Sequence, residues 1–349
     1  MVAPGDVPPS DDAAGAVLPS GLARPARRAA TGPGRPVVLD AMGGDHGPVQ
    51  TVPGALAAHR EQGAEVVLVG RREQIHRELR VHGGLGELEV VHTDGIVTMT
   101  DGVAQAIARP ATSLKVGCEL ARRRGAAFVS AGSTGAVVAC AVRVLGRADG
   151  VLRPALAIAL PTASGSTVLV DVGGTADPTA PMVAQFAVLG GRYARTVLGV
   201  PDPLVGLLSI GSEPGKGNRL VREAARLLPD LPVRFHGNVE GHDVLAGTVD
   251  VVATDGFTGN VVLKNIEGCV RTVLGMAADG AAAVPGALAE VGRRYSADAH
   301  GGAALLGLNG SVLVAHGSSG ATAVARACTV ASALTEADAL TGSTVGGRA

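Results

Sequence analysis

The sequence predicts an α/β fold: a doubly wound, mostly parallel sheet in an α/β/α sandwich. From Pro36 onward, short apolar strands alternate with helical segments along nearly the whole chain. The strand segments are continuous aliphatic runs rather than alternating ones, which is typical of parallel strands covered on both faces. Repeated strand–helix units of this kind favour a central sheet flanked by helices.

Apolar runs and turn residues place the individual elements. The expected strands are Val37–Ala41, Glu65–Val69, Leu88–His92, Ala126–Ser130, Ala155–Leu160, Thr167–Val172, Leu204–Ile210, Val233–His236, Val249–Thr254 and Val312–Ala315. The helices expected between them include Pro48–Gln62, Ser113–Arg124, Thr134–Leu145, Ala180–Thr196 and Gly217–Leu228.

Composition sets limits on the core and on the partners. Hydrophobic residues make up 46% of the 349 residues, but aromatic residues only 2%, so the core must be aliphatic. The formal net charge is −1, and tryptophan is absent. Without a basic excess or many stacking side chains, nucleic-acid binding is not expected.

Three regions divide the chain. Residues 1–35 are predicted to be a disordered leader rich in Pro, Ala and Gly, without the apolar centre of a signal peptide. Residues 36–336 are predicted to form one α/β/α catalytic domain with a short helical hairpin at about 270–300, and residues 337–349 a flexible tail. No apolar run reaches the length of about 18 residues that a transmembrane helix needs. The four cysteines lack metal or disulfide spacing, which indicates reduced thiols and a cytoplasmic protein.

Glycine-bearing turns follow many of the expected strands. They are Met42–Gly47, Ala131–Gly135, Val172–Thr175, Gly211–Gly217, Gly237–Asn238 and Gly256–Gly259. In open α/β sheets, ligands bind beyond the carboxyl ends of the strands. Six such turns with polar residues therefore predict one long cleft.

The most informative turn lies between Asp255 and Lys264. Gly256 and Gly259 are read as a turn between a strand and a helix, with Asp255, Thr258 and Asn260 beside it. Such a turn directs backbone N–H groups and a helix N-terminus at one point, which suits an anion. Lysine is scarce, occurring only at Lys115, Lys216 and Lys264, which makes Lys264 a candidate for a specific role. The alternatives are an exposed helix lysine for Lys264 and a helix cap for Asn260.

Three further turns carry polar candidates. Asp45 and His46 could be a base and its orienter, although taken alone a cap is the favoured reading of Asp45. The Gly211–Asn218 loop resembles a phosphate loop in kind but lacks the Walker pattern. Ser133 stands in what looks like an anion-cradling helix start.

Several chemistries are excluded by pattern. The sequence lacks a dinucleotide fingerprint after a strand, a nucleophile elbow and metal-ligand spacing among its His, Asp and Cys residues. The residues therefore predict an enzyme that handles phosphate or a phosphorylated ligand without a metal or redox cofactor.

Taken together, the motifs resemble the bacterial acyl-ACP:phosphate acyltransferase family (PlsX). The matching stretches are Leu39–Pro48, Ala131–Ala136, Arg153–Ala155, Leu169–Gly173, Leu207–Gly211 with Lys216–Asn218, Phe235–Asp243, Asp255–Lys264, Gly301–Gly302 through Leu305–Gly307, and His316–Ser319. The resemblance covers the chain from Val37 to Ala331.

The resemblance implies transfer of a fatty acyl group from acyl carrier protein to inorganic phosphate. The acyl phosphate produced would be used by a membrane glycerol-3-phosphate acyltransferase in phospholipid (phosphatidic acid) synthesis. It also implies a homodimer without cofactor, in the cytoplasm or at the inner face of the plasma membrane. The family's fold is similar to that of phosphotransacetylases and isocitrate/isopropylmalate dehydrogenases.

For this reaction we expect positioning and electrostatic stabilisation to dominate. Lys216 and Lys264, with turn amides near Ser133 and Gly259, are expected to hold phosphate. Asn238 and Asn260 are expected to stabilise the oxyanion, and His46 to carry the proton. The full set of expected phosphate or substrate contacts is Asp40, Gly43, Gly44, Asp45, Ser133, Thr134, Gly135, Lys216, Asn218, Asp255, Gly256, Thr258, Gly259 and His316.

Other functions remain open at this point. A CoA-dependent phosphotransacylase would share the fold, whereas a dehydrogenase would need a carboxylate cluster that the sequence does not show. An inactive carrier-protein-binding homologue is also open, because the family usually has Asn where this chain has Ser133. The stretch Ala108–Ser113 is likewise less basic than is usual in the family, and Val270–His300 is shorter.

Overall fold

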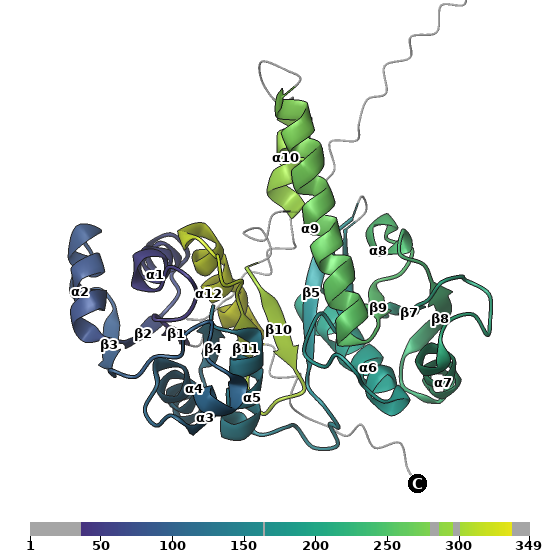
Figure 1. Cartoon of the computed structure of the whole chain (residues 1–349), viewed down its shortest axis with the longest axis horizontal. Helices are drawn as coiled ribbons and strands as arrows, with labels where there is room; N and C mark the ends of the chain where they lie inside the picture. The colour runs from purple at the N-terminus through teal and green to yellow at the C-terminus, as the bar shows by residue number, and fades with distance from the viewer. Residues whose placement is uncertain (1–35, 163–164, 280–285, 296–300, 337–349) are drawn as a thin grey trace, which may run out of the picture.

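The computed structural model describes residues 36–162, 165–279, 286–295 and 301–336. The predicted leader and tail lie outside the described residues, as does part of the region expected to form the hairpin. Within the described ranges the chain forms an α/β/α sandwich around one large sheet (Figure 1).

Eleven strands build that sheet. They are β1 (Val37–Asp40), β2 (Val66–Gly70), β3 (Glu89–His92), β4 (Ala127–Ser130), β5 (Ala155–Pro161), β6 (Ser166–Val170), β7 (Leu204–Leu208), β8 (Arg234–Val239), β9 (Val251–Ala253), β10 (Ala303–Leu306) and β11 (Val312–Val314). The helices are α1 (Pro48–Gln62), α2 (Arg72–Val81), α3 (Val103–Ala108), α4 (Ser113–Arg124), α5 (Thr134–Leu145), α6 (Ala180–Val197), α7 (Arg219–Leu227), α8 (Asp243–Ala246), α9 (Gly256–Asp279), α10 (Gly286–Tyr295) and α12 (Ala321–Glu336), with a short 3₁₀ turn at Leu228–Asp230.

The strand order is β3-β2-β1-β4-β11-β10-β5-β6-β9-β7-β8. Two parallel blocks, which we call the first half (β3 to β11) and the second half (β6 to β8), are joined by β10 and β5. Three pairings are antiparallel: β11 with β10, β10 with β5, and β5 with β6. The strands of the second half therefore run opposite to those of the first half.

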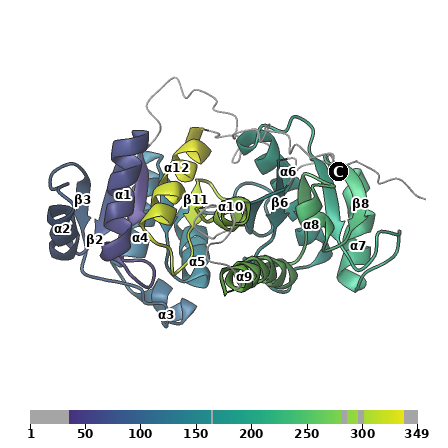
Figure 2. The ribbon, with the colours of Figure 1, turned by 90° about the horizontal axis from the view of Figure 1, so that it is seen from above.

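Helices cover both faces of the sheet (Figure 2). On one face, α1, α12 and α6 pack against the sheet in a layer that includes Leu39 and Leu68, to which α6 contributes Phe186. On the other, α4, α5 and the start of α9 pack against a layer that includes Phe128 and Leu169. The interior is aliphatic, as the composition predicts.

The predicted fold class is confirmed, and all ten expected strands are present within a few residues. The helices α1, α4 and α5 have the predicted bounds, whereas the helix expected from Gly217 begins at Arg219. The prediction missed β10. Helix α9 is continuous from Gly256 to Asp279 and packs against α10 through Leu274, which fits closely over Gly292. The hairpin expected at about 270–300 stays a prediction.

Candidate active site

The four strands of the second half end along one edge of the sheet. Because β6, β9, β7 and β8 are parallel neighbours in that order, the residues at their carboxyl ends follow the same order. These residues are Asp171, Asp255, Ser209 and Asn238. Neighbouring strands are about 4.8 Å apart, so the four ends span roughly 15 Å.

Asp171 organises the end of this edge nearest to β5. Its carboxylate is fully buried and accepts hydrogen bonds from the backbone N–H groups of Leu156, Gly174 and Thr175, at 2.8, 2.9 and 2.6 Å. Burial raises the pKa of this carboxyl above its ordinary value, and the backbone donors partly offset the rise. Asp171 therefore fixes the turn after β6.

The first turn of α9 rests on Asp171. A Cβ on Gly259 would lie 1.9 Å from the carbonyl oxygen of Asp171, and one on Gly256 would lie 2.6 Å from its carboxylate. Only glycine allows the helix to approach this closely. The two glycines thus belong to the helix rather than to a turn before it, which corrects the interpretation from sequence.

Asp255 caps α9. Its carboxylate accepts from the N–H of Thr258 and from the Thr258 hydroxyl, both at 2.7 Å. Asn260 is therefore not the cap. The N–H of Gly256 donates to Thr175 O at 2.8 Å and that of Gly259 to Asp255 O at 2.9 Å. The donors expected to hold phosphate here are engaged within the protein, so the predicted anion site at this helix start is not supported.

Two polar side chains of α9 remain beside this edge. Asn260 is exposed and lies close to Gly173, whose Cβ would be 3.8 Å from the Asn260 amide oxygen. Lys264 stands one turn further along the helix, where its Nζ forms an ion pair with Glu267 at 2.9 Å. The structure thus brings Asn260 to the strand ends, whereas Lys264 has the contacts of an exposed helix lysine.

The loop from Ser209 to Asn218 carries the second lysine. The aliphatic stem of Lys216 lies across Gly211, whose Cβ would be 3.2 Å from the Lys216 Cγ. The side-chain oxygen of Asn218 accepts from Val221 N at 2.9 Å and caps α7. Asn238 is buried and donates through Nδ2 to the carbonyl oxygens of Glu213 and Lys216, at 3.0 and 3.4 Å.

Two hydroxyls on this edge have no hydrogen-bond partner. Among the described residues, the buried side-chain oxygens without a partner are those of Thr175 and Ser209. Both stand at strand ends of the second half, and buried polar groups are nearly always satisfied elsewhere in proteins. Both oxygens are shielded from solvent, so they are unsatisfied groups of the interior rather than surface donors.

Asp40 has the corresponding place in the first half. Its buried carboxylate accepts from the Ser130 hydroxyl at 2.9 Å and from Met42 N at 3.2 Å, and the Ser130 oxygen accepts from Gly132 N at 3.1 Å. Burial raises the pKa of Asp40, and hydrogen bonds from Ser113 and Ser130 partly offset the rise. Asp40 therefore supports the turns from beneath, and its expected contact with a substrate stays a prediction.

Three turns of the first half are packed together. A Cβ on Gly43 would lie 3.0 Å from Gly132 N, so the turns after β1 and β4 touch. Asp45 N donates to Gly317 O at 2.8 Å, which joins the turn after β1 to the turn after β11. Gly44 permits this geometry because its φ is +86°.

The polar side chains on these turns point outward. Asp45 does not cap α1, since the cap position is Gly47, and Pro48 begins the helix as predicted. His46 and His316 are exposed. The Nδ1 atom of His316 lies 2.8 Å from the Ser318 hydroxyl oxygen and 3.3 Å from the Ser318 N, so the ring is held by the turn after β11.

The start of α5 is an uncapped helix N-terminus. Ser133 is at the cap position but makes no side-chain cap bond, and Thr134 and Gly135 are exposed. The first N–H groups of such a helix have no intrahelical partner and carry the positive end of the helix dipole. Apolar side chains stand beside it: a Cβ on Gly135 would meet Val103 at 2.9 Å, and one on Gly317 would meet Met99 at 2.8 Å.

The predicted site residues thus form two groups. Asp40, Gly43, Gly44, Asp45, His46, Ser133, Thr134, Gly135 and His316 lie on turns of the first half, whereas Lys216, Asn218, Asn238, Asp255, Gly256, Thr258, Gly259, Asn260 and Lys264 lie in the second. The hydrogen bonds and close approaches described above join turns within each group. A single cleft across both groups stays a prediction.

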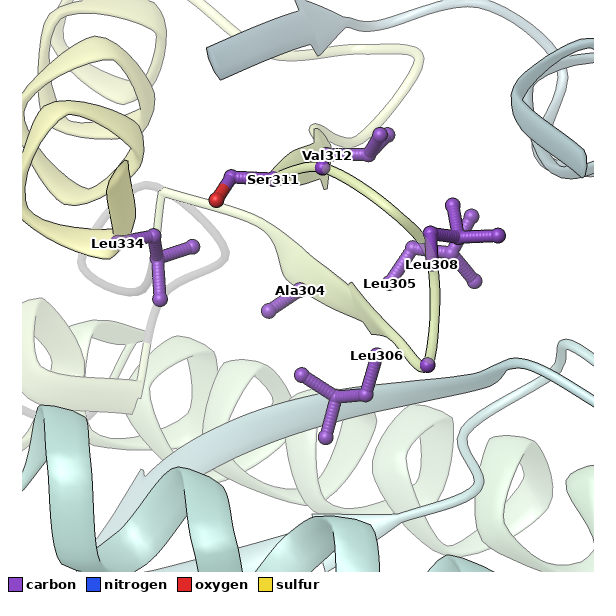
Figure 3. A pocket seen from close by; sticks show the side chains of 9 residues that line it. Ala304, Leu305, Leu306, Leu308, Ser311, Val312 and Leu334 are labelled. Carbon is purple, nitrogen blue, oxygen red and sulfur yellow. The ribbon is translucent and has the colours of Figure 1, made fainter. Parts of the chain in front are cut away.

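A small apolar pocket lies elsewhere, between the hairpin of β10 and β11 and Leu334 of α12 (Figure 3). Its volume is about 10 Å³, room for roughly one water molecule, so it does not hold a substrate. Over the described ranges, no three His, Cys, Asp or Glu side chains cluster as metal ligands would. Within the same ranges, no helix is long and apolar enough to cross a membrane.

Sequence reasoning missed two supporting residues, Asp171 and Ser130. Both are polar residues at the carboxyl end of an otherwise aliphatic strand, followed within two positions by glycine. That position was a usable signal, because a buried polar group at a strand end needs partners from the following turn.

Comparison with known proteins places the chain in a family. Residues 36–341 match the profile of the fatty acid synthesis protein family. The phosphate acyltransferase of Thermobifida fusca is 47% identical over 310 residues, covering 84% of this chain and 86% of that protein. The chain belongs to the phosphate acyltransferase family. A further member, from Thermus thermophilus, is 45% identical over 316 residues, covering 87% and 96%.

Solved structures with this fold include enzymes outside the phosphate acyltransferase family. A phosphotransacetylase from Streptococcus pyogenes aligns with a TM-score of 0.63 at 18% identity, covering 86% of this chain and 94% of that one. The 4-hydroxythreonine-4-phosphate dehydrogenase of Klebsiella pneumoniae aligns with a TM-score of 0.53 at 16% identity, covering 86% and 98%. At these identities the similarity shows the fold alone, and it agrees with the predicted fold class.

Proposed function

We propose that this protein is a phosphate acyltransferase that transfers a fatty acyl group from acyl carrier protein to inorganic phosphate. The observation that carries the proposal is the 47% identity to a phosphate acyltransferase over most of both chains. The product is an acyl phosphate, and the carrier protein leaves as a free thiol. The reaction needs no redox step.

For this reaction the protein must mainly position the two substrates and stabilise the developing charge. A phosphate oxygen attacks the thioester carbonyl carbon, a tetrahedral oxyanion forms, and the carbon–sulfur bond breaks. A thiol pKa of about 8.5 makes the thiolate a good leaving group without strong acid catalysis. The barrier therefore falls when donors hold the phosphate and the oxyanion in place.

The uncapped start of α5 supports phosphate binding better than the start of α9. Thr134 and Gly135 are exposed at a helix N-terminus whose cap residue, Ser133, makes no side-chain bond. Such an N-terminus attracts anions. At α9 the corresponding position is already occupied by the carboxylate of Asp255.

Asn260 and Lys216 supply the donors of the second half. Asn260 is exposed at the strand ends, beside the turn that Asp171 holds. Helices α5 and α9 cover the same face of the sheet, near its middle (Figure 2). We infer that the acyl donor lies between them, with the oxyanion near Asn260. His46 and His316, both exposed on the first-half turns, are the candidate proton carriers.

The partners belong to the same proposal. The acyl carrier protein, a homodimer and delivery of product to a membrane glycerol-3-phosphate acyltransferase rest on the family resemblance. Exposed Val273 and Met276, at 52% and 71%, give the far end of α9 an apolar surface that a second subunit or the membrane surface could cover. A location in the cytoplasm or at the inner face of the plasma membrane belongs to the same proposal and rests on the family resemblance.

Trapping of the acyl phosphate tests the function. Purified protein is incubated with acyl-ACP and phosphate, and hydroxylamine converts acyl phosphate to a hydroxamate that is measured by mass spectrometry. Hydroxamate that requires both protein and phosphate is expected. Because the thioester itself reacts slowly with hydroxylamine, the control omits phosphate.

Parallel reactions separate the alternatives. Acyl-CoA in place of acyl-ACP tests the phosphotransacylase suggested by the shared fold, and efficient use of acyl-CoA alone would replace the carrier-protein assignment. Binding of acyl-ACP without any phosphate-dependent product would show a carrier-binding protein that lacks the activity.

A further inference from the structure

A β-bulge turns Asn238 toward the loop that carries Lys216. In the pairing of β7 with β8, Val205 is opposite Phe235, but Gly206 is opposite Gly237, so His236 is the extra residue. Gly237 has a φ of +116°, which suits glycine at such an irregularity. After the bulge, Asn238 is opposite Leu207.

The extra residue decides which face of the sheet Asn238 occupies. Leu207 belongs to the core layer against which α7 packs, whereas Leu208 belongs to the layer on the other face. Without the bulge, Asn238 would be opposite Leu208, because a shift of one residue moves a side chain to the other face. The bulge therefore places a buried amide on the side where the loop from Ser209 leads into α7.

The amide binds the loop at two points. Its Nδ2 is 3.0 Å from Glu213 O and 3.4 Å from Lys216 O. Both neighbours are carbonyl oxygens, so the NH₂ end must face them, and its two hydrogens are engaged. A side chain used in this way has no hydrogen left for an oxyanion. The catalytic role expected for Asn238 from sequence does not fit these contacts.

We infer that Asn238 is a positioning residue that holds Lys216 in place for the phosphate substrate. The inference rests on the proposed function and on the expectation from sequence that Lys216 contacts phosphate. Two other hydrogen bonds restrain the loop, from the Arg222 guanidinium to Gly217 O and from Lys216 N to Glu213 O at 3.2 Å. Otherwise the loop is free to move: Lys216 is exposed, Gly215 and Gly217 both have positive φ, and the Ser209 side chain makes no hydrogen bond. Without the amide, the loop samples more conformations, and Lys216 spends less time in place.

Kinetics of Asn238→Leu test the inference, because leucine keeps the approximate volume and removes both donors. The KM for phosphate should rise on the order of tenfold, since two hydrogen bonds hold the loop. The KM for acyl-ACP and kcat should stay within about threefold. A fall in kcat with unchanged KM for phosphate would instead support a direct oxyanion role and overturn the inference.

A double-mutant cycle shows whether Asn238 acts through Lys216. The double variant Asn238→Leu/Lys216→Met should be no more than about twofold worse than Lys216→Met alone. Multiplicative effects would contradict the inference. Asn309→Leu is the matched control, because the Nδ2 of Asn309 also donates to a backbone carbonyl, Arg147 O at 3.0 Å, but far from these strand ends. It should leave all constants unchanged.

Hydrogen exchange tests the loop without relying on activity. The amides of residues 211–217 should exchange faster in Asn238→Leu than in the wild type, and at wild-type rates in the control. Asn238→Ser, which keeps one shorter donor, gives a second measurement if the leucine variant does not fold. Absence of acyl phosphate with the wild-type protein would refute the proposed function, whereas unchanged exchange in a folded Asn238 variant would refute this inference.

Discussion

Replacing Gly259 by alanine separates helix propensity from packing. Alanine is favoured over glycine inside a helix by about 1 kcal/mol, so propensity alone predicts that the variant is more stable. The structure predicts the opposite. The new Cβ would lie 1.9 Å from Asp171 O and 3.0 Å from the Thr254 methyl, against a normal contact of roughly 3.4 Å. Relief requires a shift of about 1.5 Å against a buried backbone, and overpacking of this kind costs about 1–3 kcal/mol.

Gly268→Ala is the matched control for this experiment. Gly268 lies in the same helix, and a Cβ there would meet nothing within 4 Å. Both variants gain the same helix propensity. The difference between their free energies of unfolding is therefore the packing cost alone, about 1–3 kcal/mol. Urea denaturation followed by circular dichroism measures it. If Gly259→Ala proves as stable as Gly268→Ala, the packing of α9 on Asp171 is wrong.

Three further outcomes are expected. Asp255→Ala should lower the free energy of unfolding by about 0.5–2 kcal/mol through loss of the α9 cap. Asp255→Asn should retain most of the wild-type stability in the same urea titration, because asparagine also caps helices. Equal losses in both variants would rule out capping. Burial raises the pKa of Asp40 above its unfolded value near 3.8. Between these two pKa values the folded state binds more protons than the unfolded state, so the free energy of unfolding falls as the pH rises. The stability of the wild type relative to Asp40→Asn should therefore decrease as the pH is raised above about 4, and parallel pH profiles would exclude this effect. Asn260→Ala should reduce acyl-phosphate formation about 10²–10³-fold if the amide donates to the oxyanion. Asn265→Ala, on the same helix, should retain the wild-type rate, and similar rates for both variants would remove Asn260 from the reaction.

The sheet was predictable because its strands are aliphatic runs separated by helices with clear ends. Helix α1, for example, begins at Pro48 and ends before Gly63, which adopts the left-handed conformation of a C-cap. Strand β10 was missed because Ala303 and Ala304 follow two glycines and give a weak apolar signal. Its place between β11 and β5 comes from pairing with strands distant in the sequence.

The site was predictable in its location but less so in its contacts. A glycine in the sequence indicates either a turn or a close approach of two backbones, and the sequence around Gly259 does not distinguish the two. The position of Asp171 in the structure shows that Gly259 is a close approach. The bulge at His236 leaves no mark in the apolar pattern, although it determines the face that Asn238 occupies. Both features depend on neighbours from other strands, which local patterns do not contain.

The unbroken length of α9 has a mechanical consequence. Gly259 sits against Asp171 near one end, whereas the other end, about 30 Å away at 1.5 Å per residue, extends beyond the sheet (Figure 1). A tilt of about 5° around that contact would move the far end by roughly 2.6 Å but Asn260, one residue from the fulcrum, by only about 0.1 Å. A force on the projecting end of α9 therefore changes the position of the Asn260 amide very little.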